Sequence, residues 1–204
     1  MGDYCDPYPQ AGAEILGFAA AFTNISASDI KPLPPESPEI FEYPLLLLAC
    51  RRPPAALSEK AAANIRAHLS AGGTLWVEDA SGGAAFDGWV RENLGRIFPD
   101  GEPKTLPPEH AVYRSFFLIK KPQGRARLSS GLEGIDRAGR AAVVYSRNDL
   151  LGVWPCDALG KPLYPITSGA VQTGKRLTLN ILMYALTGTY KLDAVHQPAL
   201  LRPV

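Results

Sequence analysis

Two adjacent carboxylates, Glu78 and Asp79, end an apolar and β-branched stretch at residues 72–79. Open α/β sheets place ligands just past the carboxyl ends of their strands, so this position favours a site. Because side chains alternate along a strand, the two carboxylates point to opposite faces and cannot act as a facing acid and base. Asp79 is the candidate base or metal ligand. The alternative is that Asp79 caps the next helix or accepts backbone N–H groups in the turn.

A histidine and an arginine follow a proline-rich segment. His110 titrates near neutrality and is a candidate acid, base or metal ligand, and Arg114 can bind a carboxylate or phosphate with two parallel hydrogen bonds. The alternative is a hydrogen-bonded loop anchor beside a salt-bridged arginine. His68 and His196 form no metal-ligand spacing with another residue, so we expect no metal site and no cofactor.

A second polar group of residues follows an apolar run near residue 146. Ser146, Asn148 and Asp149 could bind the hydroxyls of a sugar or nucleoside, with Trp154 as an aromatic platform, and Asp149 is a further catalytic candidate. Short polar residues of this kind also build ordinary turns, which is an equally good interpretation.

Small residues follow Asp79 and precede a predicted helix. Ser81 lacks the glycine spacing of a hydrolase nucleophile elbow, whereas Gly82 and Gly83 could admit an anion at the helix N-terminus. Neither the GxGxxG nor the GxxxxGK[ST] phosphate-binding motif occurs, so the sequence evidence for a phosphate site is weak.

Composition limits the class of protein. The 204 residues are 46% apolar, enough to bury a core, and the 19 prolines and 19 glycines are dispersed between apolar segments. The 21 basic and 20 acidic residues give a net charge of +1, which argues against nucleic acid as a partner. The longest apolar run, residues 45–50, is too short to span a membrane. We therefore expect one domain over residues 1–204.

The three cysteines are Cys5, Cys50 and Cys156. Their odd number and wide spacing predict neither a disulfide framework nor a CxxC metal site. We expect them to be small buried apolar residues, although Cys50 lies beside Arg51 and Arg52, which could lower the pKa of its thiol.

The first half of the chain alternates helix and strand patterns. We expect a buried helix over 11–22, an apolar strand over 43–50 and a helix capped by Ser58 and ended by Gly72 and Gly73. A strand over 74–78 and an amphipathic helix over 86–97 follow. This order predicts a layered α/β domain with parallel pairing.

Longer loops interrupt the second half. We expect a functional loop or lid over 99–115, strands over 115–119 and 140–146 with a glycine-rich turn at 131–140 between them, and a second loop over 147–170. A last helix is expected over 172–187, ended by Gly188.

Several segments together resemble the bacterial domain-of-unknown-function family numbered 4159, in order over nearly the whole chain. They are GDY, FEYPLLLLA, LSAGGTLWVEDASGG, RIFPDG, LPPEHAVYRSFFLI, GRAAVVYSRNDLLGVW and RLTLNILMYALTGTYKLDAVHQP. The resemblance implies a three-layer Rossmann-like or flavodoxin-like sandwich with a mostly parallel central sheet, similar to class I glutamine amidotransferase domains.

The resemblance also implies two differences from related proteins. Family members carry a first strand before the GDY element, which is missing or shortened here, so either the chain is shortened or the sheet loses an edge strand. In amidotransferases a cysteine follows the strand that corresponds to GTLWVED, whereas here the turn holds Asp79 and Ala80. Without that thiolate and its histidine, amidotransferase chemistry has no basis. Members are often exported, which suggests a periplasmic or exported location.

These observations favour a binding module over an enzyme. We expect residues 79–83, 99–115 and 146–154 to form one crevice that binds a small polar ligand or a segment of a protein partner. The alternative is a hydrolase acting on a carbohydrate or amide bond, with Asp79 as base or metal ligand and His110 and Asp149 assisting. A structural subunit of an envelope assembly is a third interpretation. The sequence leaves the oligomeric state open.

Overall fold

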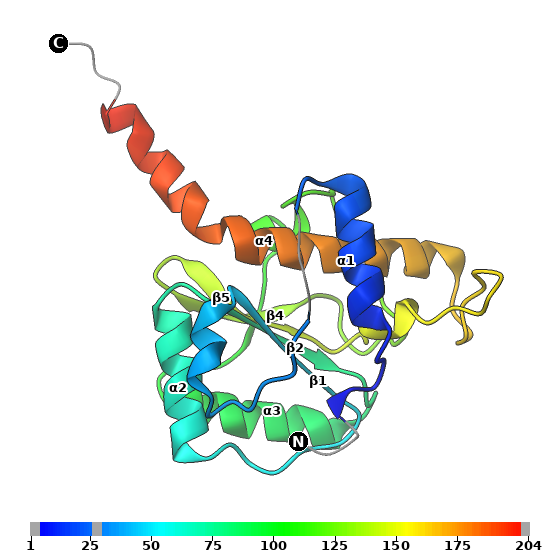
Figure 1. The fold of residues 1–204 in the computed structure, drawn as a ribbon, viewed down its shortest axis with the longest axis horizontal. Coiled ribbons are helices and arrows are strands. Elements are labelled where there is room, and N and C mark those ends of the chain that lie inside the picture. Colours follow the sequence, from blue (N-terminus) through cyan, green and yellow to red (C-terminus); the bar gives the residue numbers. More distant parts are fainter. Residues whose placement is uncertain (1–4, 26–29, 201–204) are drawn as a thin grey trace.

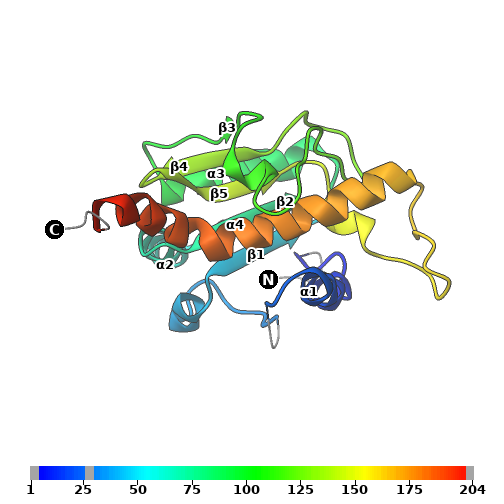
Figure 2. The same cartoon turned by 90° about the horizontal axis from the view of Figure 1, so that it is seen from above.

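The structure, a computed structural model, describes residues 5–25 and 30–200, with the backbone alone for residues 188–200. Within these residues the chain forms a five-stranded sheet with helices on both faces (Figures 1 and 2). Its elements are, in chain order, α1 (Ala11–Phe22), η2 (Pro38–Glu42), β1 (Leu45–Cys50), α2 (Glu59–Ser70), β2 (Thr74–Asp79), α3 (Ala84–Ile97), β3 (Lys104–Thr105), η3 (Ala111–Tyr113), β4 (Glu133–Arg137), β5 (Arg140–Ser146), η4 (Leu151–Val153) and α4 (Ser168–Leu200).

The sheet has the strand order β1-β2-β5-β4-β3. The strands β1, β2 and β5 are parallel, whereas β4 and β3 are antiparallel to their neighbours. The predicted α/β class is confirmed, and the parallel pairing that we expected holds for half of the sheet. The sheet is mixed because β3, β4 and β5 are connected by loops and a hairpin and not by α-helical crossovers.

A tight hairpin accounts for the antiparallel half. Ala138 and Gly139 both have positive φ, 51° and 75°, as the two-residue turn between β4 and β5 requires. The sequence predicts a turn over 131–140 and a strand over 115–119. The strand prediction is wrong, because residues 115–119 contain no strand, and β4 lies at Glu133–Arg137, within the predicted turn. The Ala-Gly pair is a weaker hairpin signal than Asn-Gly or Asp-Gly.

Two apolar cores fill the space between the sheet and its helices. On one face α1 and α4 pack against residues that include Trp76 and Val144. On the other face α2 and α3 pack against residues that include Val77 and Tyr145. Figure 1 shows the two helix pairs on either side of the strands. Side-chain alternation along β2 and β5 therefore decides which face each residue serves.

Three of the four predicted helices are confirmed with small changes at their ends, and the last helix is longer than predicted. α1 has the predicted bounds, and α2 begins as expected, because the Ser58 Oγ accepts a hydrogen bond of 3.1 Å from the Ala61 backbone N–H. α4 does not end at Gly188 as predicted and continues to Leu200, away from the sheet in Figure 1. The glycine has no terminating effect here, since glycine lowers helix propensity without blocking the helix.

Candidate functional site

The carboxylates that end β2 lie on opposite faces of the sheet, as predicted. Glu78 is fully buried on the side of α1 and α4. Its carboxylate accepts hydrogen bonds from the Trp76 Nε1 at 2.9 Å, the Ser146 Oγ at 2.9 Å and the Leu150 backbone N–H at 2.7 Å. Three donors from three segments make Glu78 the hub that joins β2 to β5 and to the segment after it.

Burial raises the pKa of Glu78 well above its usual range, and the negative charge of nearby Asp149 raises it further. The three donated hydrogen bonds oppose this effect, because they favour the ionised form. Burial outweighs these hydrogen bonds, so the pKa of Glu78 stays above that of an exposed glutamate. No route for a ligand to this group is evident, since Glu78 is completely enclosed.

Asp149 is fully buried and adopts a left-handed backbone conformation with φ of 51°. It accepts hydrogen bonds from the Tyr8 hydroxyl at 2.7 Å, from the Arg125 Nε and from the Gly152 backbone N–H at 3.1 Å. Burial and the Asp149 charge raise the pKa of Tyr8 above its usual value. The crevice expected at this end of β5 is thus filled by the protein's own side chains.

The other residues predicted here also have partners within the chain. Asn148 accepts hydrogen bonds of 2.9 Å from the backbone N–H groups of Leu128 and Ser129 and donates one of 2.8 Å to the Ser129 carbonyl. Trp154 is buried, with the Phe18 ring against it and the Lys175 ammonium over its face. The turn-building interpretation therefore describes Asn148, and Trp154 is a core residue rather than a ligand platform.

Asp79 lies on the other face and makes a turn before α3. Its Oδ1 accepts hydrogen bonds from the Ser81 backbone N–H at 2.8 Å and from the Ser81 hydroxyl, whose oxygen in turn accepts one of 3.0 Å from the Gly83 N–H. This arrangement matches the alternative in which Asp79 only holds the turn. Gly83 precedes α3 without a side-chain cap, and within the described residues the buried Asp79 Oδ2 has no hydrogen-bond partner.

Charged groups adjoin Asp79 on this face. The Tyr145 hydroxyl donates a hydrogen bond of 3.1 Å to Asp87, and the Arg147 Nε lies 3.5 Å from the same carboxylate. Burial raises the pKa of Tyr145 above its usual value, and the charges of Asp79 and Asp87 add to the effect. Arg91 joins Asp87 to Glu133 of β4, 2.9 Å from the latter. The cluster ties α3 to the sheet.

His110 lies at the opposite end of the sheet from Asp79. Its Nδ1 accepts a hydrogen bond of 3.2 Å from the Val112 backbone N–H, and its ring centre is 5.4 Å from that of Tyr184 in α4. The Tyr184 hydroxyl binds the N–H of Ala141, at the start of β5. Asp79 follows the residue of β2 that pairs with Ser146, at the end of β5.

The predicted pair is therefore not assembled, because Asp79 and His110 lie at opposite ends and on opposite faces of the sheet. Burial lowers the pKa of His110, which favours the neutral ring of a loop anchor. Arg114 is exposed close to His110 and has no ion pair with any residue from 5 to 25 or 30 to 187. The single crevice expected from residues 79–83, 99–115 and 146–154 does not form.

Cys5 and Cys50 form a disulfide, so our expectation of unpaired buried cysteines was wrong for both. They are separated by 45 residues, and the fold brings the N-terminal segment back to the end of β1. Arg51 reinforces this contact by donating hydrogen bonds to the Pro7 carbonyl at 3.0 Å and the Tyr164 hydroxyl at 3.2 Å. Cys156 is the free cysteine of the described chain and is half-buried.

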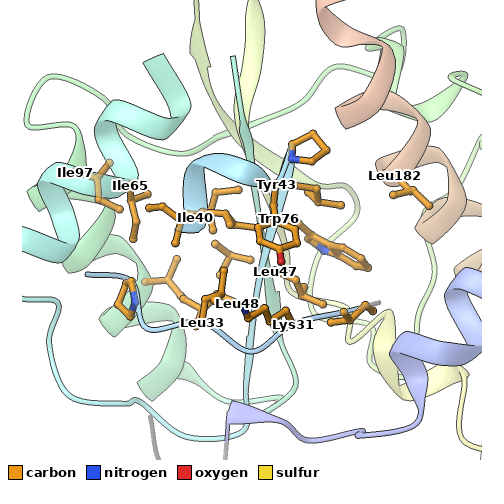
Figure 3. Close-up of a pocket in the computed structure, with 18 of the residues that line it drawn as sticks. Lys31, Leu33, Ile40, Tyr43, Leu47, Leu48, Ile65, Trp76, Ile97 and Leu182 are labelled. Atoms are coloured by element: carbon orange, nitrogen blue, oxygen red, sulfur yellow. The ribbon is translucent and has the colours of Figure 1, made fainter. Parts of the chain in front are cut away.

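The sequence pattern does not indicate the cavity that lies along β1. The strand pairs only with β2 among the described residues, so β1 is an edge strand. The cavity measures about 440 Å³, and Figure 3 shows its side chains on both sides of β1. Ile65 and Ile97 lie on the side of α2 and α3, and Leu182 of α4 lies on the other. Residues 30–35 contribute its outer wall.

The cavity is largely apolar, and two of the polar side chains around it are bound by other residues, whereas the buried Trp89 Nε1 has no hydrogen-bond partner among the described residues. Lys31 pairs with Glu39. Asn93 accepts a hydrogen bond of 2.8 Å from the Leu57 N–H and donates one of 2.8 Å to the Trp89 carbonyl. The four leucines of residues 45–48 predicted a strand covered on both faces. Helices lie on both sides of β1, but the cover is incomplete, since Leu47 is 40% exposed. Hydropathy reports which faces of a strand are covered but not whether its hydrogen-bonding edges are paired. The apolar pattern of β1 therefore could not reveal the cavity.

No helix in the described part of the chain is long and apolar enough to cross a membrane. The described residues also contain no group of three or more histidine, cysteine, aspartate or glutamate side chains arranged to hold a metal ion.

Comparison with known protein families finds a match. The family described as "Domain of unknown function (DUF4159)" matches residues 1–186. No curated protein matches the chain.

Proposed function

The chain belongs to the DUF4159 family, a domain of unknown function, and we propose that it is a binding module rather than an enzyme. Its ligand is an extended, apolar segment of a partner protein, which adds a strand to the outer edge of β1. The observation that carries this proposal is the apolar cavity of about 440 Å³ along an edge strand. Strand addition to a free sheet edge is a recurring mode of peptide recognition.

The backbone of β1 favours a polypeptide over a lipid chain. One edge of β1 is hydrogen-bonded to β2, and the outer edge carries backbone N–H and C=O groups that need partners. An acyl chain would fill the cavity but leave these groups buried without hydrogen bonds, at a cost of about 1–3 kcal/mol for each group. A β-strand fills the same space and pairs with them.

The walls of the cavity specify the sequence of the strand. Side chains of an added strand alternate between the two faces of the sheet. The cavity is apolar on both faces, with Ile65 and Ile97 on one and Leu16 and Leu182 on the other. The partner segment is therefore expected to be apolar at successive positions, like β1 itself, rather than to alternate between apolar and polar.

The outer wall is suited to open for such a segment. Pro32, Pro34 and Pro35 lie in this stretch and lack the backbone N–H that a paired strand uses. Ile30 is 54% exposed, and Leu47 of β1 is 40% exposed. Exposed apolar side chains on both sides of the edge support the proposal that a further apolar segment covers them.

The rival hydrolase function has less support. It needs His110 within hydrogen-bonding or metal-bridging distance of Asp79, and the two lie at opposite ends of the sheet. Asp149, the third proposed participant, is buried and held by Tyr8 and Arg125.

The disulfide supports a location outside the reducing cytoplasm. Disulfides persist in secreted and periplasmic proteins and are rare in the cytosol. We therefore propose that the protein works in an oxidising compartment, where the Cys5–Cys50 bond would persist.

The test uses a short peptide with a valine and isoleucine core and lysine ends. We expect it to bind and change the fluorescence of Trp76 and Trp89, which line the cavity. A peptide with every second amide N-methylated keeps the apolar side chains but loses the edge hydrogen bonds, and we expect about tenfold weaker binding. Decanol tests the apolar space alone.

A matched pair of variants tests whether the peptide binds at the edge of β1. Leu47→Lys puts a charge on the edge strand and is expected to abolish binding, whereas Leu159→Lys, at a position that is 94% exposed and outside the cavity, should leave it unchanged. Equal binding of the N-methylated peptide, or tighter binding of decanol, would show that the cavity takes apolar small molecules and not a strand.

A further inference from the structure

A second cavity, of about 410 Å³, lies between α1, α4 and the segment that precedes α4. It is separate from the cavity along β1, because the two share no lining residue. Three phenylalanines, Phe18, Phe22 and Phe117, form one part of its lining, and Lys175 and Arg176 of α4 form another. Figure 1 shows the start of α4 close to α1 and to the loop before it.

The phenylalanines form a continuous aromatic surface. The ring centres of Phe18 and Phe22 are 4.7 Å apart, and those of Phe22 and Phe117 are 5.7 Å apart with the rings edge to face. Phe22 is 50% exposed despite these contacts. An exposed aromatic surface within a concave site is suited to the apolar body of a small molecule.

Two cations adjoin this surface without a carboxylate partner. The Lys175 Nζ lies 4.8 Å from the centre of the Trp154 ring, and the Arg176 guanidinium lies 5.1 Å from that of Phe117. Neither forms an ion pair with any side chain among residues 5–25 and 30–187. The cavity lining contains no acidic residue, so its charge is positive.

We propose that this cavity binds a small carboxylate with an apolar body, its chain or ring against the phenylalanines and its carboxylate on Lys175 and Arg176. Arginine suits a carboxylate because its planar guanidinium donates two parallel hydrogen bonds. The positive charge selects against neutral and cationic amphiphiles of the same size. The small molecule and the partner strand of β1 thus occupy different sites.

Cys156 makes the site measurable, because it is the free cysteine of the described chain and lines the cavity. The rate at which iodoacetamide modifies this thiol is followed by mass spectrometry in the presence of decanoate, decanol or decyltrimethylammonium, each below its micelle concentration. We expect decanoate to slow the modification at a concentration about tenfold lower than decanol requires, and the cation to be weaker still.

Two double variants separate the site from general charge. Lys175→Gln with Arg176→Gln is expected to remove the preference for decanoate over decanol. Lys120→Gln with Lys121→Gln removes the same charge from exposed positions outside the lining and should preserve it. Thermal unfolding without ligand checks that both variants fold.

Three outcomes would overturn the proposal. The first is equal protection of Cys156 by decanol and decanoate. The second is an equal loss of the preference for decanoate in both double variants. The third is protection by inorganic phosphate as strong as by decanoate, which would indicate a charge effect without an apolar site. Leu47→Lys, which blocks the edge of β1, should not alter the protection of Cys156, so failure here is distinguishable from failure of strand binding.

Discussion

At the scale of single residues, Glu78 at the end of β2 and Asp149 after β5 are structural groups. Glu78 accepts three hydrogen bonds and Asp149 accepts hydrogen bonds from Tyr8, Arg125 and Gly152. Polar residues at strand ends predicted a ligand site, but the donors that bind Glu78 and Asp149 come from the chain itself. A buried polar group that is fully hydrogen-bonded favours a defined core and requires no ligand.

The raised pKa of Glu78 makes stability depend on pH. Above pH 4.5 the unfolded chain releases the proton of Glu78, whereas the folded protein keeps it. The free energy of unfolding therefore falls as the pH rises from 4.5 toward the pKa of Glu78 in the folded protein. The slope is at most about 1.4 kcal/mol per pH unit. Glu78→Gln is expected to lose this slope.

Urea unfolding between pH 4 and pH 8 measures the difference between the wild type and Glu78→Gln. Glu102→Gln, at an exposed glutamate without a hydrogen-bond partner among the described residues, serves as the control and should follow the wild type. If the Glu78→Gln curve runs parallel to the wild type throughout, then Glu78 is ionised in the folded state.

At the scale of elements, the β4–β5 hairpin determines that the sheet is mixed. Gly139, with φ of 75°, allows a two-residue turn, and the two strands then pair antiparallel. This turn also places Arg140 at the start of β5, where its guanidinium donates hydrogen bonds of 3.1 Å to the Thr74 hydroxyl and the Leu69 carbonyl. Through Arg140, the hairpin therefore connects β5 to the start of β2 and to the end of α2.

Two glycines should respond to alanine with opposite signs. Gly139→Ala forces a side chain into the left-handed region and is expected to lower the free energy of unfolding by about 1 kcal/mol. Gly88→Ala, in α3 with no atom within 4 Å of the added methyl group, is expected to raise it by about 0.5–1 kcal/mol. Urea unfolding measures both, and a change of the same sign would contradict the backbone explanation.

At the scale of the whole molecule, the disulfide is the longest-range covalent constraint. It joins residues 45 apart and holds the N-terminal segment, with Tyr8, against the sheet. Closing a loop of this length in the unfolded chain gives a stabilisation of about 4 kcal/mol at most.

Loss of this bond should weaken the entire fold. Cys5→Ser with Cys50→Ser is expected to lower the free energy of unfolding by about 2–4 kcal/mol, and a thiol reductant should have the same effect on the wild type. Cys156→Ser, which removes the free thiol, should change little. A double variant as stable as the wild type would mean that the disulfide contributes nothing to the free energy of unfolding.

The sequence by itself determined the local elements and the α/β class. Helix periodicity and the Ser58 cap identified α1, α2 and α3, and continuous apolar runs identified β1 and β5, because each signal depends on residues that are neighbours in the chain. Alternation along β2 also placed Glu78 and Asp79 on opposite faces correctly. The single-domain interpretation and the preference for a binding module stay predictions.

Only the tertiary structure decided the site. Whether Asp79 meets His110, whether Cys5 meets Cys50 and which edge of β1 is free all depend on strand order and on segments far apart in the sequence. Local pattern carries no information on such pairings, because the energy that selects them comes from burying whole faces against one another. The two cavities arise for the same reason, since each lies between elements that the chain brings together only after folding.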